Sequence, residues 1–390
     1  MKVLHLFANH KWTGPAELAV NVCRGLRAAA GIDARIVVGR APRDGEDWVR
    51  DEARARGLEP VLPDVRLSKH LRLLANRRDA RAVARYLEAE AVDLLHAHTP
   101  NDHWIAGGAA RRAARAAGGP RPPVVRTFYD GAGPEPTLRN RFLVGRCTDA
   151  AIAASPAGRD ALVSAFAFPA ERAFVVEPPV DTDRFDPGRP DLPDLRLELG
   201  LAPSDFVVGI VARMQWHRRF DVFLNALARA RERLPSLRAV VVGRGTNQVP
   251  VAREPARELG LGDLIRFPGY LEGDRYAGAL AAFDVKVFLV PGSDGSCRAV
   301  REAMAMGKPA IVARRGMLPE IVRHGETGLV IDDSPDTLAD AILSLAGDRA
   351  RLGALGSAAR ADALRRFSIP EAARQVLTIY RTVLSPKALP

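Results

Sequence analysis

Short apolar runs alternate with longer amphipathic stretches along almost the whole chain, and this alternation constrains the fold more than any other feature. In the first half the apolar runs are 3–8, 34–39, 91–99, 122–130, 150–155 and 173–180. The segment 15–31 has helical periodicity, with a proline near its first turn and a glycine at its end. Continuously apolar strands that alternate with helices form parallel sheets covered on both faces. We therefore predict a doubly wound α/β unit.

The pattern breaks at 180–205, which contains four prolines and several acidic residues and is predicted to be a linker. It then resumes, with helices near 220–234 and 250–259, a last amphipathic helix at 367–385, and apolar runs at 206–213, 237–243, 265–271, 283–292, 308–314 and 327–332. A chain of 390 residues also exceeds the size at which one core stops growing. We predict two Rossmann-like domains, 1–185 and 186–366, whose strand ends face each other across a cleft.

Composition excludes several classes of protein. The three cysteines, Cys23, Cys147 and Cys297, have no CxxC spacing, which argues against a disulfide framework or a zinc site and suits a reducing cytosol. The first ten residues are too short for a signal peptide, and no apolar run approaches a membrane span. We expect a cytoplasmic protein, with peripheral attachment to a membrane left open. The net charge of +11 fits either solvated helix faces or a functional basic surface. No long basic block marks a nucleic-acid site, and no nucleic-acid partner is expected.

The stretch PGSDGSCRAVREAMAMGKPAI, from Pro291 to Ile311, places two acids around a predicted strand-to-helix junction. The start of such a helix offers unpaired amides and a partial positive charge, and Gly295 and Ser296 let a phosphate approach the backbone. Glu302 follows Asp294 by eight residues, roughly 12 Å along a helix axis. A ligand as long as a nucleotide-sugar spans that distance. The alternative is a capped helix with a surface acid.

This stretch resembles the E-x7-E signature of retaining glycosyltransferases of the GT-B fold, group 1 or family 4 type. The resemblance implies that Asp294 contacts the hydroxyls of the donor sugar and that Glu302 binds the nucleotide ribose. It places Gly295, Ser296, Cys297 and Arg298 beside the donor. The chain departs from the family in its shorter first acid, in Ser296-Cys297 where Phe-Gly is usual, and in the arginines at 298 and 301.

Further motifs extend the resemblance to nearly the whole chain. IVARMQWHRRFDVFLNA, 210–226, is similar to the family's G-R-L-x-x-x-K-G-x-D segment, so Arg213 and Arg218 would neutralise the donor diphosphate, while Arg219 replaces a glycine. Gly243 ends a strand and forms a tight turn near the nucleotide, and Glu320 would line the nucleotide side.

Two motifs of the first half complete the match. In VDLLHAHTPND, 92–102, His98 matches the second histidine of the family's H-x-H, which approaches the donor sugar, and His96 would face the core. KWTGPAELAV, 11–20, resembles the family's glycine-rich loop near donor phosphate and acceptor. Gly14 and Glu17 match that loop, whereas Pro15 replaces a glycine and removes one N–H.

The resemblance implies a retaining, metal-independent transfer of a hexosyl or related sugar from a nucleotide-diphosphate sugar, without a cofactor. The acceptor would be a carbohydrate or lipid-linked molecule bound on the first-domain side, in the synthesis of cell-envelope polysaccharide, lipopolysaccharide or glycolipid. The C-terminal helix within 367–390 would pack back on the first domain. A catalytically silent GT-B protein and a nucleotide-sugar epimerase remain alternatives.

Two features outside the motifs have competing interpretations. The segment 66–87 interleaves basic residues with leucines, which fits either an anionic inner membrane face or a solvent-exposed helix face. Asp181-Thr182-Asp183 is a literal D-x-D, but its place in the predicted linker favours a turn over a metal site.

Overall fold

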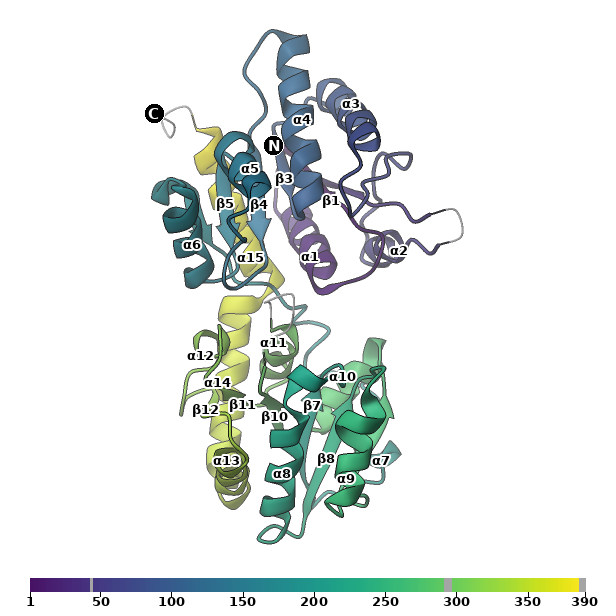
Figure 1. The fold of residues 1–390 in the computed structure, drawn as a ribbon, viewed down its shortest axis with the longest axis vertical. Coiled ribbons are helices and arrows are strands. Elements are labelled where there is room, and N and C mark those ends of the chain that lie inside the picture. Colours follow the sequence, from purple (N-terminus) through teal and green to yellow (C-terminus); the bar gives the residue numbers. More distant parts are fainter. Residues whose placement is uncertain (43–44, 291–296, 386–390) are drawn as a thin grey trace. The chain divides into compact units, whose positions relative to one another are not determined.

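The computed structural model describes residues 1–42, 45–290 and 297–385, and the chain divides into two compact units (Figure 1). The described residues of Met1–Pro179 and Ile369–Pro390 form the first unit, and those of Val180–Gly292 and Cys297–Ser368 form the second. The division lies a few residues before the boundary predicted at 185. The reason is that the Val180 amide donates to the Phe367 carbonyl at 2.7 Å and Phe185 is buried in the core of the second unit.

Six parallel strands form the sheet of the first unit, in the order β2-β1-β3-β4-β5-β6. They are β1 (Lys2–Phe7), β2 (Asp33–Val38), β3 (Leu94–Ala97), β4 (Val124–Phe128), β5 (Ala150–Ala153) and β6 (Ala173–Val175). The helices are α1 (Gly14–Ala28), α2 (Trp48–Ala55), α3 (Leu73–Glu90), α4 (Pro100–Ala117), α5 (Leu138–Cys147), α6 (Pro156–Phe166), the short η1 (Ala170–Arg172) and α15 (Ile369–Leu384). Alternate side chains of β1 face opposite layers: Val3 and Phe7 share a core with α1 and α15, and Leu4 and Leu6 share one with α3 and α4.

The last helix, α15, belongs to the first unit although both segments of the second unit, Val180–Gly292 and Cys297–Ser368, precede it in the sequence. It buries Ala373, Val376 and Tyr380 against α1 and the sheet, and Figure 1 shows this yellow helix among the purple and teal elements. Gly25 of α1 permits the close approach, because a Cβ there would lie 2.8 Å from the Ile369 side chain. The C-terminal helix therefore packs on the first unit, as the resemblance implies.

The second sheet has the order β12-β11-β10-β7-β8-β9 and is also parallel throughout. Its strands are β7 (Phe206–Val211), β8 (Leu237–Val242), β9 (Ile265–Gly269), β10 (Val285–Phe288), β11 (Ala310–Ala313) and β12 (Gly328–Ile331). Its helices are α7 (Leu195–Glu198), η2 (Trp216–Arg218), α8 (Phe220–Arg231), η3 (Val249–Arg253), α9 (Glu254–Glu258), α10 (Gly273–Ala282), α11 (Arg298–Ala305), α12 (Leu318–Ile321), α13 (Pro335–Gly347) and α14 (Arg349–Phe367). Helices α8 and α13 pack on one face and α10 and α11 on the other, while α14 contributes side chains to both cores. The prediction of two Rossmann-like units is confirmed.

The segment 180–205, which we predicted to lead from the first domain into the second, is part of the second unit from Val180 onward. Asp194 caps the short helix α7 through the amides of Arg196 and Leu197, and Leu195 and Leu201 are buried in the core. The D-x-D within it forms a turn, in which an Asp181 carboxylate oxygen accepts from the Arg184 amide at 3.2 Å. Over the described ranges, none of the helices is both long and apolar enough to cross a bilayer.

Candidate functional site

The strand order of the second unit reverses between β7 and β10. The chain moves from β7 to β8 and β9 on one side, and from β10 to β11 and β12 on the other. Ligands of open α/β sheets bind at such a reversal, outside the carboxyl ends of the strands. Arg218, in η2 after β7, donates from Nη1 to the carbonyl of Val290, after β10, at 3.2 Å. The two loops that carry the predicted donor-site residues therefore meet at the reversal.

The loop after β7 presents cationic side chains at this place. Arg213 is exposed and Arg218 is half-buried. Arg219 has a φ of 57°, in the left-handed region, which explains why the resembling family has a glycine at this position. Its Nη1 pairs with Asp333 at 2.6 Å. Arg219 is thus used in an ion pair with the loop after β12, whereas Arg213 extends into solvent.

Gly243, directly after β8, lets the neighbouring loop pass close to the same strand ends. Its φ is 138°, and a Cβ at this position would lie 2.1 Å from the carbonyl oxygen of Ala212. Gly245 is comparable, since a Cβ there would lie 2.5 Å from the carbonyl oxygen of Met214. The loops after β7 and β8 are therefore in direct backbone contact, and Gly243 shapes the crevice.

Cys297 and Glu302 are held at and within α11. Cys297 is buried, has a φ of 46° and caps the helix, which begins at Arg298. Glu302 is also buried, and its Oε2 accepts from the Tyr276 hydroxyl at 2.5 Å while its Oε1 lies 3.2 Å from Arg298 Nε. The sequence gives no sign of Tyr276, because it lies on α10, 26 residues before its partner.

The other predicted donor-side residues have different positions. Asp294, Gly295 and Ser296 lie outside the described residues. Glu320 is exposed on α12, and its carbonyl accepts from Arg366 Nη2 at 2.8 Å. Arg301, whose role the sequence left open, is buried with its guanidinium 4.9 Å from the ring centre of Phe367, so it contributes to the core of the second unit.

The strand order of the first unit also reverses, between β1 and β3. Asp102 holds the loops that follow these two strands. The Asp102 carboxylate accepts from the amides of Ala8 at 2.8 Å, His98 at 2.9 Å and Thr99 at 2.9 Å. These amides belong to the loops that follow β1 and β3. Burial raises the pKa of Asp102 to about 6. Sequence reasoning missed Asp102, although Thr99-Pro100-Asn101-Asp102 is a capping-box pattern.

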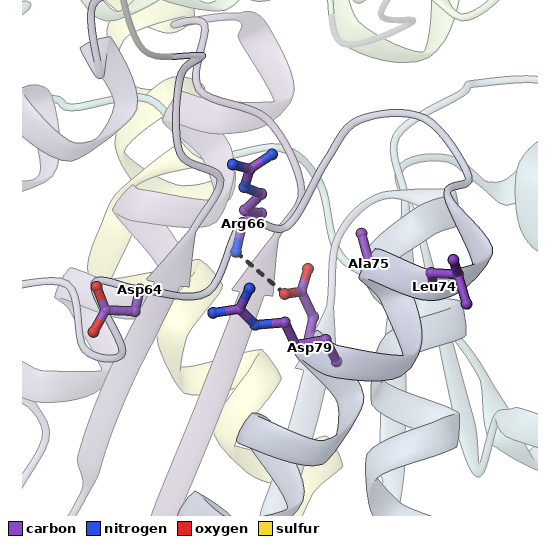
Figure 2. Close-up of a pocket in the computed structure, with 6 residues that line it drawn as sticks. Asp64, Arg66, Leu74, Ala75 and Asp79 are labelled. Carbon is purple, nitrogen blue, oxygen red and sulfur yellow. Dashed lines mark hydrogen bonds between the residues drawn. The ribbon is translucent and has the colours of Figure 1, made fainter.

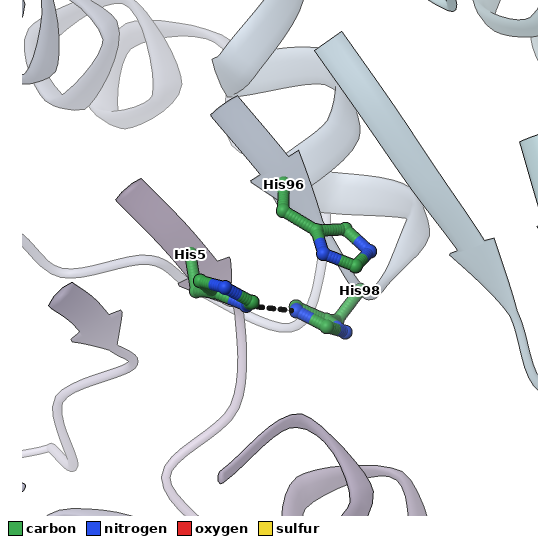
Figure 3. A group of neighbouring side chains, drawn as sticks. All are labelled: His5, His96 and His98. Atoms are coloured by element: carbon green, nitrogen blue, oxygen red, sulfur yellow. Dashed lines mark hydrogen bonds between the residues drawn. The ribbon is translucent and has the colours of Figure 1, made fainter. Parts of the chain in front are cut away.

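Three buried histidines lie together in the first unit (Figure 3): His5 of β1, His96 of β3 and His98 after β3. His5 Nδ1 is 2.9 Å from His98 Nε2, and His98 Nδ1 is 2.6 Å from the Tyr129 hydroxyl. Burial lowers the pKa of His5 to about 3, and lowers those of His96 and His98 well below the ordinary value. All three imidazoles are therefore neutral at pH 7.

The nitrogens of these three rings lie close enough together to hold one metal ion. Among the described residues, this is the group of histidine, cysteine and acidic side chains that meets this condition. Hydrogen bonds already engage both nitrogens of each ring: His96 contacts Tyr380 at 2.5 Å and Thr127 at 2.7 Å, and His5 Nε2 lies 3.4 Å from Tyr380. A metal ion would have to replace several of these bonds. The network instead orients His98 and joins α15 to the sheet.

A cavity of about 380 Å³ opens beside His98, entirely within the first unit. Pro15, His98, Arg126, Tyr129 and Asn140 are among the residues that line it. Gly14 is the first residue of α1, whose first turn brings Pro15 to the cavity.

Glu17 was predicted on the acceptor side together with Pro15, but its side chain lies apart from the cavity that Pro15 lines. It does not line the cavity but is buried, with its Oε1 3.8 Å from Nη2 of Arg56 at the end of α2. The predicted Gly14–Glu17 loop therefore contributes Pro15 to the cavity wall and Glu17 to the packing of α1 on α2.

The basic and leucine-rich segment folds into an extended stretch followed by α3. The Asp79 carboxylate accepts from the amides of Leu67 at 3.0 Å and Arg66 at 3.3 Å, which holds the stretch on the helix (Figure 2). A shallow hollow of about 270 Å³ lies there between Asp64, Arg66, Leu74 and Asp79. The side chains of Leu73 and Leu74 are 64% and 82% exposed.

Two family models match the chain. Residues 12–184 match the model described as Glycosyltransferase Family 4, and residues 205–348 match the model described as Glycosyl transferases group 1. The curated relatives include a D-inositol 3-phosphate glycosyltransferase of Rhodococcus opacus (strain B4), 33% identical over 308 residues, which covers 74% of this chain and 67% of the relative. A GDP-mannose-dependent alpha-(1-6)-phosphatidylinositol monomannoside mannosyltransferase of Mycobacterium tuberculosis (strain H37Rv) is 34% identical over 226 residues, or 56% of this chain and 57% of the relative. The chain thus spans between 57% and 67% of the lengths of these two relatives.

Solved structures show the same fold. The Anabaena protein HepE, crystallised in complex with UDP, superposes with a TM-score of 0.76 at 23% identity, covering 98% of this chain and 100% of that one. A glycosyltransferase from Rickettsia africae ESF-5 gives a TM-score of 0.80 at 18% identity, with 99% of each chain covered. The two units therefore have the GT-B fold.

Proposed function

Because this chain belongs to the group 1 glycosyltransferases, we propose that it transfers a sugar from a nucleotide-diphosphate sugar to an acceptor with retention of anomeric configuration. The observation that carries the proposal is the bond from Arg218 to the carbonyl of Val290, because it joins the loops after β7 and β10 at the reversal of the second sheet. A nucleotide bound there would have Arg213 and Arg218 on one side and the start of α11 on the other. Cations and helix amides together are suited to a diphosphate.

In the proposed reaction the bond between the anomeric carbon and the diphosphate oxygen breaks first, and an oxocarbenium-like sugar forms. Arg213 and Arg218 stabilise the negative charge that develops on the leaving diphosphate, so that no metal ion is needed. The acceptor hydroxyl then attacks from the face that the diphosphate leaves, and its proton passes to the leaving diphosphate oxygen as the new glycosidic bond forms. A double displacement would require a carboxylate nucleophile on the opposite face, and the motifs supply none.

Glu302 and Asp294 keep the roles that the resemblance implies, binding the ribose and the sugar hydroxyls. The Tyr276 hydroxyl and the Arg298 guanidinium hold the Glu302 carboxylate in one orientation, which favours a fixed hydrogen bond to a ribose. Both ring nitrogens of His98 are bonded to protein groups, so we assign its contact with the donor sugar to the main-chain carbonyl rather than to the imidazole.

Arg213→Ala tests the donor site. The side chain is exposed, so folding should be unaffected, and the rate of sugar transfer should fall by about 10²-fold or more, as for loss of one preorganised charge-stabilising group. Arg233→Ala, an exposed arginine just past the other end of α8, is the matched control and should transfer normally. The assay is release of nucleoside diphosphate from a panel of nucleotide-sugars, with anomeric configuration read by NMR and metal independence by activity in EDTA. Wild-type activity in Arg213→Ala would refute the assignment.

We propose a glycolipid or other cell-envelope acceptor, taken up at an anionic membrane face. The relatives named above act, by their names, on inositol phosphate and on a phosphatidylinositol monomannoside, which supports a polyol-phosphate or lipid-linked acceptor. The exposed Leu73 and Leu74 lie in the same short stretch of sequence as the exposed basic residues Lys69, Arg72 and Arg77, which supports attachment at the inner face of a membrane.

Vesicle sedimentation tests the membrane contact. The double variant Leu73→Ser, Leu74→Ser should lose binding to anionic vesicles, whereas Leu138→Ser, which removes a leucine that is 88% exposed elsewhere on the same unit, should bind as wild type does. If wild type does not sediment with anionic vesicles at low salt, the membrane part of the proposal fails.

A further inference from the structure

The cavity beside His98 is lined by a buried cation that forms no ion pair with any residue the structure describes. Arg126 of β4 is 5% exposed and lines the cavity. Its Nη1 donates to the carbonyl of Thr127 and, at 3.4 Å, to that of Ala97, and its guanidinium lies 4.8 Å from the ring centre of Phe128. Its Nε is buried and has no hydrogen-bond partner among the described residues. No carboxylate of the described chain pairs with it either.

Asp102 is an acid whose charge acts on Arg126, but its carboxylate is already hydrogen-bonded to other groups. Its two carboxylate oxygens accept from the amides of Ala8, His98 and Thr99 and from the Thr99 hydroxyl at 2.7 Å. Burial also raises its pKa to about 6, so part of its charge is lost just below neutral pH. Asp102 therefore fixes the backbone of the two loops and compensates Arg126 only at a distance.

A second arginine approaches the same cavity from α5. Arg139 donates from Nη2 to the carbonyl of Pro100, a lining residue, at 3.0 Å, and its Nε too is buried without a partner within the described ranges. Its charge is one of those that lower the pKa of Arg126, although burial is the larger cause and brings that pKa to about 10. Both guanidinium groups remain cationic at pH 7.

The other polar residues that line the cavity include three uncharged ring side chains, one amide and two acids. Burial lowers the pKa values of His98 and His103 well below their ordinary value and raises that of Tyr129, so all three are uncharged at pH 7. Asn140 adds an amide side chain. Two acids also line the cavity: Asp130 accepts from the Ala132 amide at 3.0 Å, and Glu135 is exposed. Arg126 is therefore the cation that lines the cavity, Arg139 lies behind its wall at Pro100, and among the described residues neither lining acid forms an ion pair with Arg126.

An unpaired buried charge is costly, and proteins retain one where a ligand compensates it. A guanidinium with an unused Nε–H is suited to a phosphate, because its planar fork matches phosphate oxygens. We propose that this cavity binds the acceptor of the transfer reaction through a phosphate group, with Arg126 as the principal phosphate ligand and Arg139 as the second. That the bound molecule is the acceptor rests on the proposed function, whereas binding of a phosphate group in the cavity does not.

The experiment measures binding to the full chain by titration calorimetry, with glycerol 3-phosphate as the phosphate probe and glycerol as its unphosphorylated match. Wild type should bind glycerol 3-phosphate and not glycerol. Arg126→Met should weaken phosphate binding at least tenfold and Arg139→Gln several-fold. Arg141→Gln removes the same charge from the exposed side of α5 and should leave binding unchanged.

Further arms separate the alternatives. If Arg126→Met does not fold, Arg139→Gln against Arg141→Gln decides. Phosphatidylcholine vesicles with and without phosphatidylglycerol distinguish a lipid phosphate from a free one: binding that depends on Arg126 supports the proposal from either source. Phosphate binding that is equal in Arg126→Met, Arg139→Gln and wild type would show that Arg126 only ties β3 to β4, and would overturn the proposal, as would no phosphate binding by wild type.

Nucleotide binding in the same variants separates this inference from the proposed function. Nucleoside diphosphate affinity should be unchanged in Arg126→Met, because the proposed donor site lies in the second unit. If wild type binds no nucleoside diphosphate and transfers no sugar, the proposed function fails, while loss of phosphate binding in Arg126→Met would still establish the cavity as a phosphate site.

Discussion

Lowering the pH should destabilise the first unit through its buried histidines. His5, His96, His98 and His103 are all buried, and burial holds the pKa of each below the ordinary 6.5, to about 3 for His5. In the unfolded chain these rings bind protons near pH 6.5, whereas the folded unit does not bind them until much lower pH. The unfolded state therefore binds more protons as the pH falls, and stability decreases below about pH 6.5.

The size of the effect follows from proton linkage. Between pH 7 and pH 5, His5, whose folded pKa is about 3, should remove about 1.9 kcal/mol from the free energy of unfolding. His96, His98 and His103 act in the same direction. Asp102 acts in the opposite direction, because its folded pKa is raised from 3.8 to about 6 and the folded state takes up its proton first. Its contribution returns about 1.3 kcal/mol over the same range. Four buried histidines oppose this one acid, so the net effect of acidification is a loss of stability.

Tryptophan fluorescence can follow the first unit alone. Trp12, Trp48 and Trp104 belong to the first unit and Trp216 to the second, so a Trp216→Phe background reports only the first unit during urea unfolding. In this background, His5→Asn should reduce the loss between pH 7 and pH 5 by about 1.9 kcal/mol. The asparagine amide can occupy the place of Nδ1 and keep the bond to His98.

His70→Asn, an exposed histidine of the same unit, is the control and should leave the pH dependence almost as it is in the background protein. If His5→Asn retains the full pH dependence while His70→Asn behaves the same way, then His5 titrates normally and the account of the neutral cluster is refuted.

Three further outcomes are expected. Gly243→Ala, with its Cβ 2.1 Å from a carbonyl oxygen, should cost about 2 to 4 kcal/mol in the unfolding of the second unit and weaken nucleoside diphosphate binding, while Gly262→Ala, in open space, should change unfolding by less than about 0.5 kcal/mol. Gly25→Ala should destabilise the first unit by about 1 to 3 kcal/mol, since its Cβ would press on Ile369, and a neutral result equal to that of Gly145→Ala would contradict the packing of α15. The three cysteines, Cys23, Cys147 and Cys297, are all buried, and burial raises the pKa of the Cys23 thiol to about 12. Ellman's reagent should therefore react slowly with the native protein and should label three thiols after unfolding. Rapid labelling of the native protein would contradict this burial.

Local patterns in the sequence were sufficient for the elements and their order. The apolar runs at 3–8 and 206–213 became β1 and β7, and the predicted helix start at Pro15 lies where proline is tolerated, in a first turn. The prolines and acids of 180–205 indicate turns, but they do not show which surface the intervening leucines pack against.

The candidate donor site was partly visible in the sequence, since Arg213, Arg218 and Glu302 lie in motifs near strand ends. Their supports were not visible. The Glu302–Tyr276 bond joins residues 26 positions apart, and the His98–His5 bond joins residues 93 positions apart. No periodicity connects such pairs.

By itself the sequence determined two doubly wound α/β units and the family to which they belong, because hydrophobic period and motif order are local properties of the chain. Only the tertiary structure decided that three histidines are buried as neutral rings and that Tyr380 of the last helix contacts His96 across 284 positions. It also decided that Arg126 lines a cavity with no carboxylate paired to it among the described residues. Charge state and partnership depend on which distant groups packing brings together and on how much water it removes from around them.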